Sequence, residues 1–119
     1  MKVSKKNITQ GVEILAAYDP DTAAQCIYEE GIIKAGMPIT QDGKKAIDGA
    51  GAVGILLYDV DTGSNPNATL VVGGQIDWQK VKAYNEEVTV GAQEISNILP
   101  RITFREVVDG KTYVWKNGQ

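Results

Sequence analysis

Side chains branched at Cβ dominate the apolar part of this sequence. It contains 12 valines, 12 isoleucines and 8 threonines but only 5 leucines. Such side chains are restricted at χ1 and fit a pleated sheet better than a helix. Thirteen glycines agree with this, since small β domains use glycine at turns and bulges. The sequence therefore predicts a mainly β fold, a small barrel, β-clip or β-tulip-like sheet, with one or two short helices.

The chain has 119 residues, the size of one ordinary domain. Residues 1–10, MKVSKKNITQ, carry three lysines and no acid, and their few apolar side chains cannot order them on an isolated domain. We expect a flexible basic N-terminal arm at 1–10 and a single β-rich domain at 11–119. The domain holds 9 basic and 15 acidic residues. An acidic body with a basic arm argues against nucleic-acid binding.

Apolar runs separated by turn residues predict the strands. Strands are expected at 12–18, at 27–28, twice within 31–40, at 53–60, at 68–72 and at 75–76. Turns or loops are expected at 19–22, 41–44 and 61–67, and a turn or bulge is expected at 73–74. The run at 53–60, VGILLYDV, is the most apolar of the chain, and it is therefore expected to be a central strand buried on both faces.

Two short helices and a hairpin complete the expected structure. Asp77 is placed to cap a helix that contains Trp78 and Val81. Thr89 is expected to cap a second helix, which Pro100 ends. The clearest hairpin spans about 102–115, because its Asp-Gly pair supplies the positive φ angles of a type I′ turn.

The residues needed for most catalytic chemistry are missing from the sequence. There is no histidine, which removes the usual general base and the commonest metal ligand. Cys26 is the single cysteine, so it is read as a small half-buried side chain. The acidic pairs Glu29-Glu30 and Glu86-Glu87 are read as solvated surface. We expect no catalytic residue, no cofactor and no metal ligand, and hence not an enzyme.

Two motifs resemble ligand loops but lack the required context. Residues 49–54 match G-x-G-x-x-G, but a strand is expected after them where a dinucleotide site needs a helix. Residues 59–70 begin like a calcium loop, but Gly63 and Leu70 stand where oxygen ligands are required. No apolar run has the length of a secretory or membrane-spanning segment. We therefore expect no membrane partner.

One passage resembles a known family. Residues 48–56, DGAGAVGIL, are followed by a loop, then by residues 68–76, ATLVVGGQI, and by Trp78. This order is similar to the small head decoration proteins of tailed bacteriophages, of the lambda type. Residues 34–39, KAGMPI, resemble the Pro-flanked strand with which that family enters its sheet. The resemblance covers about residues 11–99, and the hairpin and tail at 102–119 lie beyond the usual C-terminus of the family.

The resemblance implies a structural protein that forms homotrimers. Such trimers sit at the three-fold positions of an expanded phage head and stabilise it against the pressure of packaged DNA. The implied partners are the major capsid protein and other copies of the chain, and the implied location is the virion exterior, after assembly in the bacterial cytoplasm. The expected capsid-binding residues of the arm are Val3, Lys5, Lys6 and Ile8, since an extended arm can add a strand to a partner's sheet. The expected subunit-interface residues are Ile76, Trp78, Tyr113 and Trp115.

A second reading is a small β-clip module that binds a ligand or a carbohydrate. In that reading Trp78, Tyr113 and Trp115 form an aromatic stacking surface. The alternative for the same three side chains is a place in the core or in a subunit contact.

Overall fold

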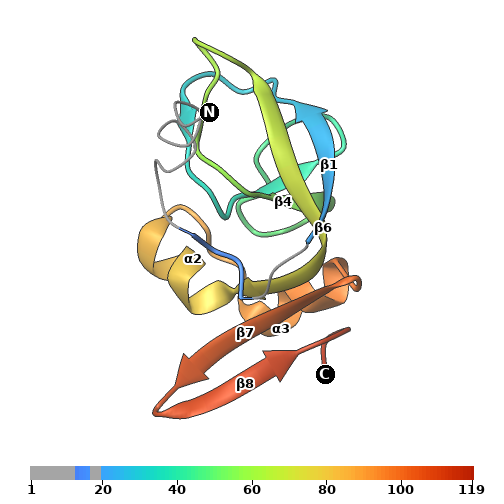
Figure 1. Ribbon diagram of the computed structural model, residues 1–119, viewed down its shortest axis with the longest axis vertical. Coiled ribbons are helices and arrows are strands. Elements are labelled where there is room, and N and C mark those ends of the chain that lie inside the picture. Colours follow the sequence, from blue (N-terminus) through green and yellow to red (C-terminus); the bar gives the residue numbers. More distant parts are fainter. Residues whose placement is uncertain (1–12, 17–19) are drawn as a thin grey trace, which may run out of the picture.

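A computed structural model describes residues 13–16 and 20–119 of the chain (Figure 1). Strands make up 41% of it and helices 13%, which confirms the predicted mainly β class with two short helices. The strands are β1 (Asp21–Cys26), β2 (Ile32–Ile33), β3 (Pro38–Thr40), β4 (Ala52–Leu56), β5 (Val60–Asp61), β6 (Asn67–Asp77), β7 (Ile102–Val108) and β8 (Lys111–Trp115). The helices are α2 (Trp78–Tyr84) and α3 (Ala92–Ile98). The expected N-terminal arm lies outside the described residues.

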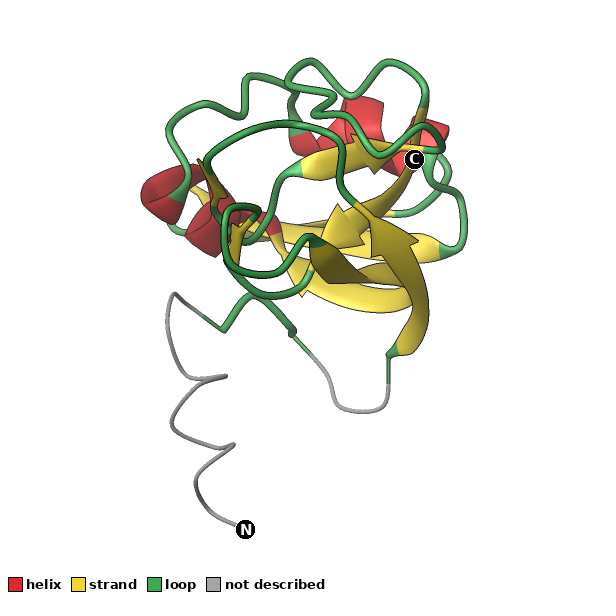
Figure 2. Ribbon diagram, turned by 90° about the horizontal axis from the view of Figure 1, so that it is seen from above, coloured by secondary structure: helices red, strands yellow, loops and turns green. Residues whose placement is uncertain are grey.

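Strand β6 connects the two halves of the sheet. Its first half lies between β4 and β1, and both pairings are antiparallel. Its second half, from Gly74 to Asp77, pairs with β7 in parallel. The strand order is β3-β4-β6-β7-β8, with β1 beside β6, and the sheet curls into a half-barrel. Viewed from above, the two helices lie apart from each other at the periphery of the strands (Figure 2).

The start of the sheet differs from the sequence prediction. Of the strand expected at 12–18, the described part makes one antiparallel bridge, between Leu15 and Ile76. The first strand is instead β1, which begins at Asp21, within the expected turn. Gly73 and Gly74 of β6 explain the difference. A Cβ atom on Gly73 would lie 2.7 Å from Asp21 Oδ2, and one on Gly74 would lie 3.2 Å from the Pro20 Cα atom, so the two glycines leave room for this segment against β6.

The expected central strand is divided between two sheets. Strand β4 lies between β3 and β6, as a central strand should, but it ends at Leu56. Val60 belongs to β5, which pairs with β2 in a separate two-stranded sheet. The predicted burial on both faces is wrong at Val53, whose side chain is 39% exposed. The chain bends between the two strands because the Asp59 carboxylate accepts hydrogen bonds from the Ala35 amide and the Tyr84 hydroxyl.

One helix cap was predicted correctly and the other was not. Asp77 caps α2, and its carboxylate accepts a hydrogen bond from the Lys80 amide at 3.3 Å. The cap of α3 is Gly91, not Thr89. The Thr89 hydroxyl instead donates to the Ile47 carbonyl, as does the Thr89 amide, and ties the loop before α3 to the segment before β4. The second helix ends before Pro100, as expected.

The C-terminal hairpin agrees with its prediction in position and turn. Strands β7 and β8 pair in antiparallel register from Phe104↔Trp115 to Val108↔Lys111. Asp109 and Gly110 have φ angles of 53° and 80°, as a type I′ turn requires. In Figure 1 the hairpin forms the lower end of the molecule, away from β1 and β4.

The glycine-rich motif at 49–54 leads into strand β4, as the sequence indicated, and not into a helix. Gly49 and Gly51 have φ angles of 84° and 76°, which places them in turns before the strand. Gly54 lies within β4, where a Cβ atom would be 2.9 Å from Leu70 Cβ and 3.0 Å from the Val71 carbonyl oxygen of β6. The motif therefore allows strands β4 and β6 to approach closely.

This close approach predicts a stability cost for Gly54→Ala. The added methyl group must displace β6, so we expect a loss of about 1 to 3 kcal/mol in the free energy of unfolding, the usual range for overpacking. Urea denaturation followed by tryptophan fluorescence measures it. Gly63→Ala is the matched control, because its Cβ atom would meet only the Asp61 carboxylate at 3.4 Å, and it should change stability by less than about 0.5 kcal/mol. Equal stability of the two variants would contradict the packing argument.

Candidate interaction surface

Two of the four expected subunit-interface residues lie in the core. The side chains of Ile76 and Trp78 have no solvent exposure. The Trp78 ring packs edge-on against Phe104, with ring centroids 5.1 Å apart, and its Nε1 atom donates to the Val90 carbonyl at 3.0 Å. Neither side chain can reach a second subunit, so the expectation is wrong for these two. For the same reason Trp78 cannot contribute to an aromatic stacking surface.

The other two expected residues, Tyr113 and Trp115, lie on β8 and contact each other. Their rings are stacked with centroids 5.9 Å apart and planes 6° from parallel. The Trp115 Nε1 atom donates to the Glu106 carboxylate at 3.1 Å, and the ring packs against the core. Tyr113 is 38% exposed. This pair remains available for contact with a partner.

Both faces of the hairpin expose apolar side chains. Tyr113 shares this exposure with three valines from the two strands, and Val114 is the most exposed of them, at 55%. We define the hairpin surface as the exposed apolar side chains of β7 and β8, namely Val107, Val108, Tyr113 and Val114. Val107 and Val114 lie on one face of the strand pair, and Val108 and Tyr113 lie on the other. Exposed apolar areas are candidate contact sites.

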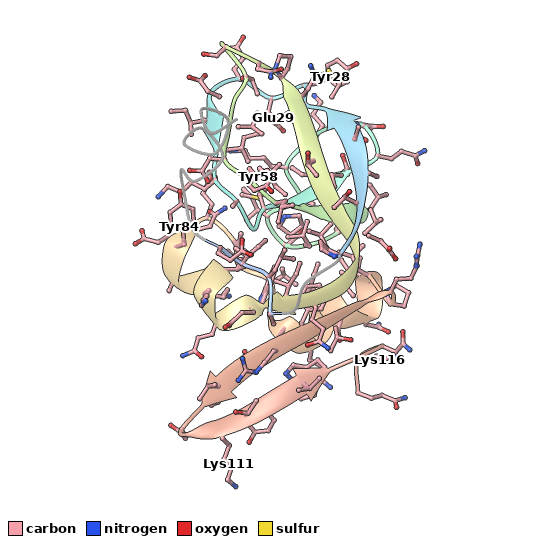
Figure 3. The ribbon with its side chains drawn as sticks, in the orientation of Figure 1. Tyr28, Glu29, Tyr58, Tyr84, Lys111 and Lys116 are labelled. Atoms are coloured by element: carbon pink, nitrogen blue, oxygen red, sulfur yellow. The ribbon has the colours of Figure 1, made fainter. Side chains whose placement is uncertain are left out.

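Buried residues of β7 and hydrogen bonds of the C-terminal tail anchor the hairpin to the rest of the domain. Phe104 and Ile102 of β7 are fully buried. Beyond β8 the tail turns back to α3, where the Gly118 amide donates to the Ser96 hydroxyl at 2.9 Å and the Gln93 side chain donates to the Gly118 carbonyl at 3.0 Å. Figure 3 places Lys111 at the tip of the hairpin and Lys116 at the opposite end of β8, on the side of the tail. The tip is thus presented to solvent by a strand pair that is anchored at its other end.

A second apolar feature is an open groove of about 320 Å³ between β4, β6 and the end of α3. Val53 and Val72 contribute to one wall, and Leu99 and Pro100 to the other. At its rim Arg101 forms an exposed ion pair with Asp21 at 2.9 Å. Exposed pairs of this kind contribute little to stability. Arg101 is the charged side chain that lines the groove, and its pairing with Asp21 leaves the remaining lining apolar.

A polar cluster joins the loop before β3, the loop before β5 and α2. The Tyr84 hydroxyl donates to Asp59 Oδ2 at 2.5 Å, and the Lys34 ammonium lies 5.0 Å from the Tyr84 ring centroid. The buried Asn85 side chain donates to the Lys34 and Ala35 carbonyls. Burial, together with the hydrogen bond to Asp59, raises the pKa of Tyr84 to about 12. Since these polar groups satisfy one another, the cluster serves to hold three segments together.

Three of the four acidic side chains expected at the surface are exposed, and Glu29 is half-buried. Glu86 and Glu87 are exposed, and Glu87 forms an ion pair with Lys45 at 3.1 Å. Glu29 accepts a hydrogen bond from the Lys45 amide, and Glu30 is exposed. Among residues 13–16 and 20–119 no group of three or more acidic or cysteine side chains is arranged to hold a metal ion. Within the same residues no helix has the length and apolar character needed to cross a membrane.

The comparisons with protein-family models, with curated proteins and with solved structures gave no match to this chain.

The hairpin and its aromatic residues were predicted from the sequence, but the hairpin surface was not. Val107 and Val108 are adjacent, so one of the two must face away from the core side of the sheet. This signal was available in the sequence. The sequence held no signal that β8 is the outer strand of the sheet, because strand order depends on contacts between distant segments.

The polar cluster predicts a specific loss of stability in alkaline solution. The folded-state pKa of Tyr84 is about 12, above the ordinary value of about 10. Its stabilising effect is therefore complete below pH 10 and is lost as the pH rises from 10 to 12. Tyr84→Phe should lower the free energy of unfolding by about 1 to 2 kcal/mol at pH 7, since a hydrogen bond to a carboxylate is removed.

The measurement is urea denaturation at pH 7 and at several values between 10 and 12. Tyr84→Phe should show a shallower alkaline decline than the native chain. Tyr58→Phe is the control, because Tyr58 is 36% exposed and lies outside the hydrogen bond to Asp59. Identical alkaline declines in the native chain and in Tyr84→Phe would contradict the assignment.

Proposed function

We propose that this protein is a structural capsid decoration protein of a tailed bacteriophage. It binds the expanded head from outside as a homotrimer at three-fold sites and stabilises the head against internal DNA pressure. Its partners are the major capsid protein and other copies of the chain. It is made in the bacterial cytoplasm and ends on the exterior of the virion.

The main support for the proposal is where the residues that resemble the decoration family lie in the fold. The passage at 48–56 forms the turn before β4 and β4 itself, and the passage at 68–76 forms most of β6. The two strands are neighbours, paired at Ile55↔Val71 and Leu56↔Leu70. The likeness to the decoration family therefore concerns one continuous piece of sheet at the centre of the domain.

The hairpin surface gives further support for a protein that works by contact. Binding proteins need an exposed apolar area on a stable support, and the anchored hairpin provides both. Tyr113 and Trp115 are the two interface candidates that remain from the sequence analysis. The alternative, a β-clip module for a ligand or a carbohydrate, is weaker because its stacking surface loses Trp78 to the core.

In this proposal the N-terminal arm attaches the protein to the capsid. Val3 and Ile8 would enter the partner's sheet as an added strand, and Lys5 and Lys6 would contact acidic groups beside it. Three arms on one trimer reinforce one another because each bound arm raises the local concentration of the others.

Deletion of residues 1–10 tests the attachment. Co-sedimentation with expanded, undecorated heads of the protein's own phage should fall at least tenfold, because three weak contacts are lost together. The charge reversal Lys5→Glu with Lys6→Glu should also weaken binding, and more strongly at low salt. Lys44→Glu, at an exposed site in the body of the domain, is the control and should bind like the native chain. Undiminished binding of the deletion variant would exclude the arm as the anchor.

Sedimentation velocity at micromolar concentration tests the assembly. The native chain should sediment as a trimer or as a multiple of trimers, and the deletion variant should do the same, because the arm is assigned to the capsid and not to the subunit contact. A native chain that remains a monomer both in solution and on the head would contradict the proposed trimer.

A further inference from the structure

We propose that strand β8 is a self-pairing edge. It joins the β8 strand of a second copy in antiparallel orientation, with Tyr113 on the two-fold axis. This contact is separate from the capsid attachment and does not depend on the proposed function. It assigns Tyr113 and Trp115 to a two-fold contact, so the three-fold contact of the proposed trimer must use other residues. Three observations support it: the direction of the backbone groups of β8, the side chains of β8, and the differences between β8 and the edge strands β1 and β3.

The turn geometry determines which backbone groups of β8 are free. In a two-residue type I′ hairpin the residues that flank the turn exchange hydrogen bonds with each other. Val108 and Lys111 are that pair, so Tyr113 and Trp115 also direct their backbone groups toward β7. Thr112 and Val114 direct theirs outward. The Val107 amide agrees with this alternation, because it points away from β8 and donates to the Gln79 side chain at 3.2 Å.

The outward groups of β8 meet no neighbouring strand within the described part of the chain, since β8 ends the strand order. An extended strand is the partner that satisfies alternating amide and carbonyl groups along an edge. Between Thr112 and Trp115 the edge has no proline, no charge and no bulge, which are the usual means of preventing such pairing.

The edge at β3 is protected, and the edge at β1 differs from β8 in its side chains. Beside β3 the following turn folds back, and Ile39 forms a bridge with Lys45, while the Ala46 amide donates to the Pro38 carbonyl at 2.8 Å. Strand β1 pairs with β6 in regular register from Thr22 to Cys26, and the ion pair with Arg101 involves only its first residue, Asp21. β8 differs from β1 in its side chains, which are β-branched or aromatic from Thr112 to Trp115, whereas those of β1 from Thr22 to Cys26 are small or polar.

The composition of β8 indicates a second copy as the occupant. In antiparallel pairing, hydrogen bonds form only where outward residues of one strand face outward residues of the other. The register that uses all of β8 pairs Thr112 with Val114 of the second copy, and Val114 with its Thr112. Tyr113 then faces Tyr113 across the axis in a pair without hydrogen bonds, where side chains are closest.

The side chains are complementary in this register. Lys111 faces Trp115 of the second copy, which allows a cation–π contact, and no two like charges lie opposite each other. On the other face the Thr112 and Val114 pairs join the exposed Val107 of each hairpin into one β-branched layer. The contact therefore uses Tyr113 and Val114 of the hairpin surface, and Val107 lies beside it on β7.

Cysteine cross-linking tests the register. Cys26 is first replaced in a Cys26→Ser background, and Tyr113→Cys, Thr112→Cys and Val114→Cys are compared under mild oxidation at micromolar concentration. Only position 113 faces itself across the axis, at a separation that suits a disulfide. Tyr113→Cys should form a covalent dimer on a non-reducing denaturing gel at least ten times faster than either control. Equal rates for the three variants, or no dimer from Tyr113→Cys, would overturn the proposal.

A second measurement does not depend on introduced cysteines. Tyr113→Lys places two positive charges opposite each other on the axis and should weaken self-association through β8 at least tenfold in sedimentation equilibrium. Val107→Lys, at a nearly equal exposure of 37% against 38%, adds the same charge on β7 and should weaken it less than threefold. Circular dichroism establishes that both variants are folded, and equal effects of the two would count against the edge.

The experiments distinguish a failure of the β8 contact from a failure of the proposed capsid function. Loss of cross-linking with retained capsid binding overturns the β8 contact alone. Specific cross-linking at position 113 with no binding to expanded heads retains the β8 contact and overturns the capsid assignment.

Discussion

The pairing of β6 on both sides determines the architecture of this domain. Its first half is held between β1 and β4, and its second half between Leu15 and β7. The change of partners occurs at Gly73 and Gly74, where a side chain would collide with the Pro20–Asp21 segment. A strand of 11 residues that changes partners halfway bends the sheet into a half-barrel and brings α2 and the hairpin to one end.

The core is arranged around that same strand. Ile76 of β6 is fully buried beside Phe104 of β7, and the Trp78 ring, which follows directly, packs edge-on against Phe104. Asp77 between them caps α2. Consecutive residues therefore complete the sheet, begin the helix and fill the core. For this reason Ile76 and Trp78 are unavailable to a partner, while the more distant Tyr113 remains exposed.

Features set by neighbouring residues could be predicted from the sequence, and those set by distant contacts could not. The β-branched composition, the Asp77 cap and the Asp109-Gly110 turn were read correctly because each acts within a few residues. Strand β1 was missed because its pairing with β6 spans about 50 residues and overrides the local turn tendency of Pro20. Thr89 was misassigned because its hydroxyl bonds to Ile47, 42 residues earlier. The interface prediction was wrong for Ile76 and Trp78 because contacts with distant segments bury both side chains.

A sheet of this form cannot avoid having edges, and the treatment of those edges indicates where partners act. A closed barrel satisfies every strand, but a half-barrel built on one strand that changes partners leaves β1, β3 and β8 at its borders. A returning turn covers β3, and small or polar side chains line β1 from Thr22 to Cys26. Strand β8 is regular, carries β-branched and aromatic side chains from Thr112 to Trp115, and is anchored at its base by Phe104 and the tail. An unprotected edge favours aggregation unless a specific partner occupies it, so its geometry is best explained by an assembly role for the hairpin.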